Sequence, residues 1–462
     1  MNWTNIDKNN PFASWMIRIF ILVLILLFFY AYYRAGFVFQ SGIYSIYQII
    51  SIIGIIFLAL ILRLRPKIHL NVVMVIASIV IGVYILEVVS IFILPDSIKI
   101  QSKKNDHVET AKKLKVIFDK RTKLEVVKSL RNQGVDAVVT SGVIKSYNPG
   151  GLLFLGGISN KKTVCCNESG KYMIYQSDRY GFNNPDSEWD NSSIEWFLTG
   201  DSFTNGAAVQ PGEDISGQIR LITNESVVSV GMGGNGPLVE LAALKEYSQS
   251  MHPKRVLWLY YEGNDLSKDI LVEEKVPLLM KYLDNDFSQN LINRQAEIDS
   301  MLISNFEKKL KKQEQDKNKS SIQEQSLRYK TKWMRLHTLR SLINFNEIFS
   351  FINPLFIKIL KKAKRITEEQ GGKFYFVYLP QFERYNGLKA DHDEFNNKEE
   401  VMDLVKNLGI PIIDMHKEVF SNHNDPLSLF PMRLNGHYNA EGYSSVAKKI
   451  VAVIKKYEQI NN

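Results

Sequence analysis

The region before residue 95 contains three apolar stretches, each long enough to cross a lipid bilayer as a helix. They run over about Trp15–Tyr33, Ile43–Leu62 and Leu70–Leu94, and few charged residues interrupt them. The hydrocarbon of a bilayer needs roughly 20 helical residues to cross it, and three such stretches in succession are not expected in a soluble core. The sequence therefore predicts three N-terminal transmembrane helices.

The basic residues between these stretches predict how the chain is oriented. The short loop Arg63–Lys67 holds three cationic side chains, whereas the other loop holds only Arg34. Because basic loops stay on the cytoplasmic side, we expect the N-terminus inside and everything after Pro95 outside the cytoplasmic (inner) membrane. A smaller basic cluster after the third stretch argues the other way; it comprises Lys99, Lys103 and Lys104.

Charge and cysteine content exclude several classes of protein. The chain has 57 Lys and Arg against 48 Asp and Glu, a net charge of +9, but the lysines are scattered, so no nucleic-acid partner is implied. Cys165 and Cys166 are adjacent, which is too few and too close for a zinc site or a disulfide framework. We expect two small buried thiols, with a vicinal disulfide as the alternative.

After residue 190, short β-type runs alternate with helical patterns. This alternation is typical of an α/β fold whose parallel sheet is covered on both faces by helices. The predicted strands are Ile194–Leu198, Val227–Val230, Val256–Tyr261, Phe374–Leu379 and Ile410–Ile413.

The composition along the chain predicts five segments. Residues 1–97 form the three-span anchor, and 98–190 form a helical stalk with an accessory region of strands and turns. The α/β domain is split into 191–270 and 346–462 by an insertion at 271–345. The middle of this insertion is almost entirely charged or polar, which favours a solvated helix over a binding surface.

Four short motifs follow the predicted strands, at the edge where open α/β sheets bind ligands. The first is Gly200–Ser202, which presents a hydroxyl at a strand-to-helix corner. The second is the glycine-rich run Gly231–Gly236, the third is Asn264, and the fourth is His437 before the terminal helix. Taken singly, each has a structural alternative, such as a helix cap or an ordinary turn.

As a set, these motifs resemble the SGNH or GDSL-like hydrolase superfamily, and within it the membrane-anchored extracytoplasmic branch related to polysaccharide O-acetylation. The resemblance covers about 194–265 and 373–455. It implies a flavodoxin-like three-layer α/β/α domain. It also implies Ser202 as nucleophile, His437 as base, and an oxyanion hole made by the Ser202 and Gly234 amides and the Asn264 side chain. Gly231 is the alternative to Gly234.

One position departs from the family. Members carry an aspartate two or three residues before the histidine, where this chain has Leu434 and Asn435. Three interpretations stay open. Asn435 orients His437, or Asp425 or Asp414 replaces the missing acid, or the domain is inactive and binds ligand only.

A dense polar stretch precedes the first strand of the domain. It includes Asn167, Glu168, Asp178 and Arg179. Asp178 and Arg179 are candidates for contact with a sugar hydroxyl or carboxylate, as is Asp201 beside the nucleophile. The structural alternative is that Asp178 and Arg179 pin a loop to the sheet, and that Asp201 caps a helix.

The sequence thus predicts a membrane-bound extracytoplasmic serine esterase or O-acyltransferase. Its substrate would be an acyl ester, in the first place acetyl, of a cell-surface or exported glycan. A transferase would need a separate multi-span membrane protein as acyl donor. Two alternatives are a catalytically weak or inactive glycan-binding assembly protein and a membrane-associated lipase or lysophospholipase. No metal or organic cofactor is implied.

Overall fold

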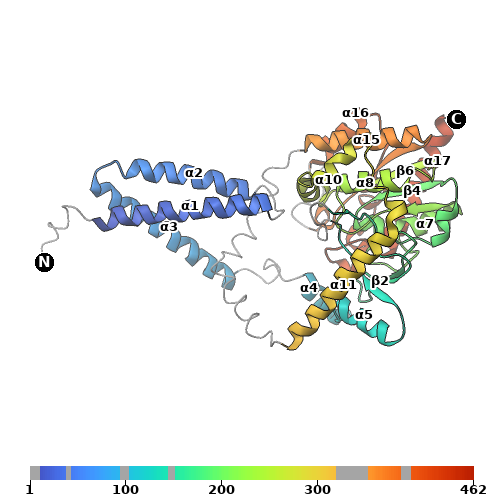
Figure 1. Cartoon of the computed structure of the whole chain (residues 1–462), viewed down its shortest axis with the longest axis horizontal. Coiled ribbons are helices and arrows are strands. Elements are labelled where there is room, and N and C mark those ends of the chain that lie inside the picture. Colours follow the sequence, from blue (N-terminus) through green and yellow to red (C-terminus); the bar gives the residue numbers. More distant parts are fainter. Residues whose placement is uncertain are drawn as a thin grey trace. The chain divides into compact units, whose positions relative to one another are not determined.

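The computed structural model describes residues 11–37, 43–93, 103–143, 151–318, 352–386 and 397–461. Two compact units are present: one formed by residues 1–100 and 320–349, the other by 101–319 and 350–462 (Figure 1). The second part of the predicted insertion, from residue 319 on, lies outside the described residues.

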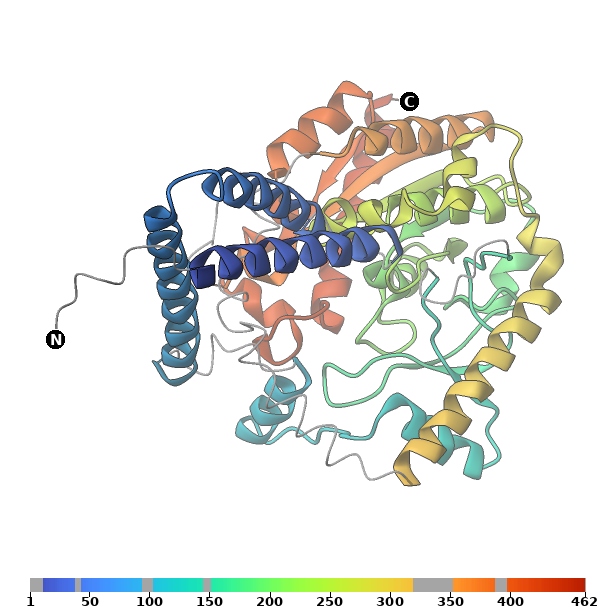
Figure 2. The ribbon, with the colours of Figure 1, turned by 60° about the vertical axis from the view of Figure 1, so that its left-hand side comes forward.

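The N-terminal unit consists of the helices α1 (Pro11–Phe37), α2 (Ile43–Ile61) and α3 (Pro66–Ile93), with α1 packed along α2 (Figure 2). Two of them are long and apolar enough to cross a membrane, over Pro11–Tyr33 and Pro66–Val89, and only 11% of each stretch is buried. Helices in a soluble core would hide such surfaces, so the two exposed helices indicate a membrane anchor.

The predicted third span is not supported to the same degree. The described apolar part of α2, Tyr47–Ile61, is shorter than the other two stretches. The whole of α2 has 19 residues, and at about 1.5 Å per residue it is about 28 Å long, slightly less than the roughly 30 Å of bilayer hydrocarbon.

The second unit is built on a five-stranded sheet in the order β5-β4-β6-β7-β8, with every neighbouring pair parallel. In sequence order this is 2-1-3-4-5, the order of flavodoxin-type sheets, whose ligand crevice lies where the order reverses. The strands agree with the predicted ones within two residues at either end; they are β4 (Trp196–Gly200), β5 (Val227–Ser229), β6 (Arg255–Tyr261), β7 (Lys373–Leu379) and β8 (Ile412–Asp414).

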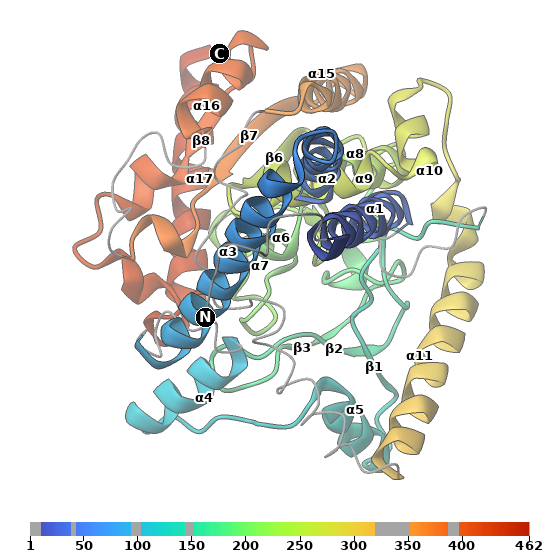
Figure 3. The ribbon, with the colours of Figure 1, turned by 90° about the vertical axis from the view of Figure 1, so that its left-hand side faces the viewer.

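Successive side chains of each strand enter two separate cores. In β6, for example, Val256 and Trp258 join one core, while Leu257 and Leu259 join the other. Such alternation without exposure requires cover on both faces. Helices α8 (Pro237–Tyr247) and α15 (Pro354–Glu369) contribute to the first core, and α7 (Ile215–Thr223) and α17 (Ala440–Asn461) to the second (Figure 3).

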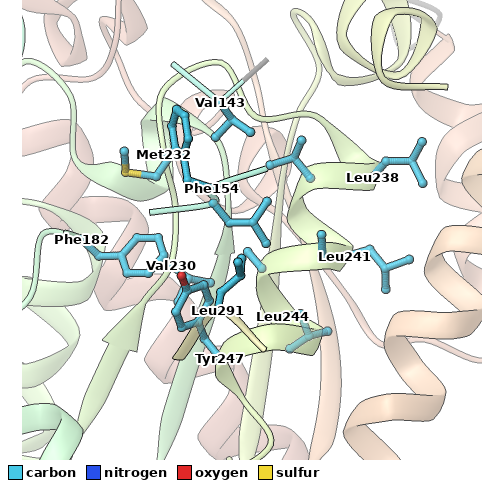
Figure 4. Packing of buried hydrophobic residues seen from close by; sticks show 14 of the residues in the cluster. Val143, Phe154, Phe182, Val230, Met232, Leu238, Leu241, Leu244, Tyr247 and Leu291 are labelled. Atoms are coloured by element: carbon cyan, nitrogen blue, oxygen red, sulfur yellow. The ribbon is translucent and has the colours of Figure 1, made fainter. Parts of the chain in front are cut away.

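The first core continues into the region ahead of β4. Phe154 and Phe182 pack there with Met232 and with Leu241 and Tyr247 of α8 (Figure 4). This region holds α4 (Lys103–Lys113), α5 (Lys123–Asn132) and a small sheet of β1 (Ala137–Val139), β2 (Lys162–Val164) and β3 (Ile174–Gln176). The accessory region is therefore fixed to the main domain by shared packing.

The described part of the insertion, up to residue 318, is helical, and its apolar side chains join the first core. Strand β6 is followed by η4 (Asp265–Asp269), and α9 (Ile270–Glu273) leads into the insertion. The further described elements of the insertion are α10 (Pro277–Met280), η5 (Lys281–Leu283), η6 (Leu291–Arg294) and α11 (Gln295–Asn318). The remaining elements are short apart from α16 (Lys398–Asn407); they are η3 (Asp186–Asp190), α6 (Ser202–Asn205), η8 (Phe382–Arg384), η10 (His416–Phe420), η11 (Pro426–Leu429) and η12 (Pro431–Arg433).

Candidate active site

Ser202 lies at the carboxyl end of β4, the strand at which the sheet order reverses. Strand β4 ends at Gly200, and Ser202 is the first residue of α6. A Cβ on Gly200 would lie 2.1 Å from the Thr204 hydroxyl, so only glycine allows this sharp strand-to-helix corner. The corner places Ser202 at the carboxyl edge of the sheet, where sheets of this order bind their ligands.

His437 approaches Ser202 from the loop that leads into α17. Its Nε2 lies 2.8 Å from the Ser202 Oγ, a hydrogen-bonding distance. The imidazole packs on Phe203 with a centroid separation of 4.7 Å. The structure thus brings together the two residues that the sequence proposed as nucleophile and base, from positions 235 residues apart.

The second ring nitrogen of His437 faces a carboxylate that sequence reasoning did not assign. Glu168 Oε1 lies 2.9 Å from His437 Nδ1, and Glu168 Oε2 accepts the backbone N–H of His437 at 2.7 Å. Because a carboxylate only accepts, it places the proton of the neutral imidazole on Nδ1 and leaves Nε2 to accept the serine hydroxyl. Ser202, His437 and Glu168 therefore form a continuous hydrogen-bonded chain, which is the geometry of a Ser–His–acid triad.

Gly436 makes this contact sterically feasible. A Cβ at position 436 would lie only 2.3 Å from Glu168 Oε2. Any side chain there would push the carboxylate away from His437. Gly436 therefore leaves room for the carboxylate of Glu168, a residue distant in the sequence, to reach His437.

Glu168 is positioned by the hairpin that joins β2 to β3. The Asn167 side chain donates to the Asp119 carbonyl and accepts the Gly170 N–H, and the Asp119 N–H donates to the Gly170 carbonyl. On the domain side, the Ala208 N–H donates to the Cys166 sulfur at 3.2 Å. The hairpin is held on both sides of Glu168, which fixes the carboxylate against the imidazole.

The pair shifts the pKa values of both its members. Burial alone would lower the pKa of His437, but the Glu168 carboxylate outweighs burial and raises it to about 9. Burial likewise acts to raise the pKa of Glu168, but attraction and hydrogen bonds from His437 prevail and lower it to about 2. An acid that favours imidazolium in this way stabilises the charge that forms when the base takes a proton.

Glu168 replaces the acids that the sequence placed beside the histidine. The Asn435 side chain donates to Glu383, and Asp425 pairs with Arg433 at the surface. Asp414 pairs with Lys398 at 2.9 Å. The interpretation of Asn435, Asp425 or Asp414 as the orienting group is wrong, because Glu168 occupies the hydrogen-bonding position at Nδ1.

The residues predicted to contact the substrate make structural contacts. Asp201 is 1% exposed, and its carboxylate accepts the Phe203 N–H, so it caps α6 from inside. Asp178 is fully buried and accepts hydrogen bonds from Asn184 and Trp189, among others. Burial raises the pKa of Asp178 to about 6.

Arg179, next to it, pairs with two carboxylates, Asp186 and Asp190, each at 2.7 Å. Together with Asp178 it fixes the loop ahead of β4. These contacts match the structural alternative that the sequence left open.

The glycine-rich run between β5 and α8 borders Ser202. A Cβ on Gly233 would lie 3.8 Å from that of Ser202, and Gly231 packs against Thr204. Gly234 has φ +84° with open space where a side chain would project, a left-handed conformation that favours glycine. The assignment of the Gly234 amide to an oxyanion hole remains a prediction.

Asn264 follows β6 at the same edge of the sheet. Its Nδ2 donates to Asp269 Oδ2 at 2.5 Å. The same segment reaches the glycine-rich run, because Glu273 accepts the Gly236 and Leu238 N–H groups at 2.6 and 2.8 Å. The segment after β6 thus contacts Asn264 through Asp269 and the end of the glycine-rich run through Glu273.

The two cysteines lie close to the triad as free thiols. Their sulfur atoms are 3.1 Å apart, with Cys165 buried and Cys166 half-buried. Within the described ranges, no group of three or more His, Cys, Asp and Glu side chains is arranged to hold a metal ion.

Comparison with known proteins adds little to this geometry. No protein-family model matches the chain, and no curated protein matches it. Among solved structures, the chain is similar to a crystal structure of a member of the lipolytic protein G-D-S-L family from Veillonella parvula. The identity is 13% and the TM-score is 0.31, over 57% of this chain and 99% of that one.

Proposed function

We propose that this chain is a membrane-anchored serine esterase of the SGNH/GDSL type. The observation that carries the proposal is the triad, with Ser202 Oγ 2.8 Å from His437 Nε2 and Glu168 Oε1 2.9 Å from His437 Nδ1. A serine hydroxyl is a weak nucleophile until a base removes its proton, and this arrangement supplies both the base and the acid that supports it.

The reaction would begin with attack of Ser202 on the ester carbonyl while His437 takes the hydroxyl proton. The imidazolium that forms is stabilised by Glu168, and the carbonyl oxygen becomes negatively charged. The side-chain amide of Asn264 and the backbone amides of Ser202 and Gly234 are the proposed donors to that oxygen. His437 then protonates the leaving alcohol, and a water activated by the same imidazole releases the acid from Ser202.

The substrate we propose is an acyl ester, in the first place acetyl, of a cell-surface or exported glycan. The support is the sequence resemblance of the four motifs to the branch concerned with polysaccharide O-acetylation. If a sugar hydroxyl replaces water in the second step, the same residues perform O-acyl transfer. In that case a separate multi-span membrane protein would supply the acyl group.

A second candidate is an esterase acting on membrane lipids. The observation that favours it is an exposed apolar segment beside the hairpin that carries Glu168. Ile117 is 91% exposed, and its carbonyl lies against Gly170. Such a surface near an active site suits a substrate drawn from a bilayer.

A fluorophosphonate probe tests the serine chemistry. We expect the full-length protein in detergent to be labelled and the folded Ser202→Ala variant to remain unlabelled. Equal labelling of both, or none of either, would leave only a binding or assembly role. For a labelled enzyme, release of acetate from acetylated oligosaccharides compared with release of fatty acid from lysophospholipid separates the two substrate classes.

The proposed orientation places the N-terminus inside and the α/β domain outside the cytoplasmic membrane. This needs an odd number of crossings, so α2 must span as well as α1 and α3. Lys456→Cys, on the exposed face of α17, should react with an impermeant maleimide in intact spheroplasts, and Lys67→Cys should not. Protection of Lys456→Cys until the cells are lysed would show that the domain is cytoplasmic.

A further inference from the structure

The chain that follows α4 exposes a short apolar segment in basic surroundings. Leu114 is 55% exposed, Val116 40% and Ile117 91%. The cationic side chains around them are exposed as well; they are Lys112, Lys113, Lys115, Lys120 and Arg121. Between residues 112 and 121 the only acid is Asp119, which pairs with Arg121 at 2.6 Å.

We propose that this segment, Lys112–Arg121, docks on an anionic phospholipid surface. Large aliphatic side chains rimmed by lysines are the composition of interfacial membrane-binding elements. The apolar groups enter the boundary between headgroups and acyl chains while the ammonium groups pair with lipid phosphates. The positive charge of the lysines around the apolar side chains is complementary to an anionic bilayer, and we therefore propose anionic phospholipid as the partner.

The length of the chain places the segment within reach of the bilayer. Only residues 94–102 separate the end of the apolar helix α3 from the start of α4. Even fully extended, the chain from Ile93 to Lys103 spans at most about 35 Å. The 11-residue helix α4 adds about 16 Å, so the segment begins within about 50 Å of the end of α3.

Docking here also concerns the active site, because the segment is joined to the hairpin that carries Glu168. The Asp119 N–H donates to the Gly170 carbonyl at 2.9 Å, and the Asn167 side chain donates to the Asp119 carbonyl at 2.9 Å. Helix α4, in turn, packs against η12, which precedes His437. In Figure 3, α4 and the chain after it run along the outer edge of the domain.

The docked segment would therefore hold the Glu168 side of the active site close to the lipid headgroups. This suits an acyl ester that is part of a lipid or is carried on one. The inference rests on the membrane anchor and not on the ester chemistry.

Depth-dependent quenching of a fluorophore tests the docking. The full-length protein, with Cys165 and Cys166 changed to Ser, carries Ile117→Cys labelled with bimane and is placed in nanodiscs of phosphatidylcholine and phosphatidylglycerol. We expect a blue shift of the bimane emission and strong quenching by lipids with a nitroxide near the headgroup. The matched control is Leu221→Cys, an exposed leucine of α7 that is 76% accessible, and we expect no quenching there.

Charge reversal tests the electrostatic part. With Lys112, Lys113 and Lys115 changed to Glu, the quenching at position 117 should be largely lost. The same reversal at Lys448, Lys455 and Lys456, three exposed lysines of α17, should leave it unchanged.

Two results would overturn the inference. One is quenching at position 117 no greater than at 221. The other is equal quenching in nanodiscs with and without phosphatidylglycerol. Neither depends on labelling of Ser202 by a fluorophosphonate, so failure of the docking and failure of the esterase proposal are distinguishable.

Discussion

The main sheet and the accessory sheet contribute to the triad in different ways. Ser202 follows strand β4 of the main sheet, and His437 precedes α17, the C-terminal helix of the domain. Both belong to short motifs that are recognisable in the sequence. Glu168 comes from the tip of a hairpin in the accessory sheet, 269 residues before the histidine. The comparison shows that the position of an acid in space, and not its place in a motif, determines whether it can serve the histidine.

Removal of Ser202, the proposed nucleophile on the main sheet, should have the largest effect. Ser202→Ala should lower ester hydrolysis on the order of 10⁴-fold or more, because the hydroxyl that would form the acyl-enzyme is removed. Initial rates with p-nitrophenyl acetate, compared with the folded wild type, measure the loss. Activity that persists within about 10-fold of wild type would remove Ser202 from the mechanism.

Removal of the accessory-sheet acid should come next. Glu168→Gln should reduce kcat by about 10³- to 10⁴-fold, since the amide neither fixes the tautomer nor stabilises the imidazolium. The matched control is Asp425→Asn, which alters the acid nearer in sequence and should retain nearly full activity. If Asp425→Asn reduced kcat more than Glu168→Gln, then Asp425, and not Glu168, would be the acid that supports His437.

Removal of Asn264, the proposed side-chain donor to the oxyanion, should have a smaller effect on kcat. Asn264→Ala should cost about 10²- to 10³-fold in kcat with little change in KM, because the donor acts on charge present only in the transition state. Asp269→Ala, which releases the amide that it holds, should cost about 10- to 100-fold. Asp269→Asn keeps an acceptor and should recover most of the activity. A loss confined to KM would contradict this positioning role.

The smallest expected effect is on the free energy of unfolding, to which the interaction between Glu168 and His437 contributes. The lowered pKa of Glu168, about 2, adds stability that is present above the unfolded value near 4.5 and is lost as pH falls toward 2. The raised pKa of His437, about 9, adds stability that is complete below the unfolded value near 6.5 and is lost as pH rises through 9.

The stability difference between wild type and Glu168→Gln should therefore be greatest between pH 4.5 and 6.5, at about 1–3 kcal/mol. Urea unfolding of the full chain in micelles at several pH values measures it. A difference that does not vary with pH would show that the two side chains do not interact as charges.

Much of the fold was predictable because its signals are local. Each strand of the main sheet is a short run of apolar residues, and glycine or polar residues mark the corners where Ser202 and Asn264 lie. Glu168 was visible only as part of a dense polar stretch, since no local pattern says which acid folds back onto a distant histidine. The close fit of Glu168 to Gly436 is likewise a tertiary contact. For α2, length is marginal for a span, and sequence alone does not decide such a case.

The most direct test of the account is the pH dependence of fluorophosphonate labelling at Ser202 in wild type and Glu168→Gln. Because Glu168 raises the pKa of His437 to about 9, labelling of wild type should keep increasing with pH above neutrality as the imidazole loses its proton. In Glu168→Gln the labelling should be slower at every pH. The increase in labelling should also occur at lower pH, toward the ordinary histidine pKa near 6.5. A rise at the same pH in both proteins would contradict the assignment of Glu168 as the partner of His437.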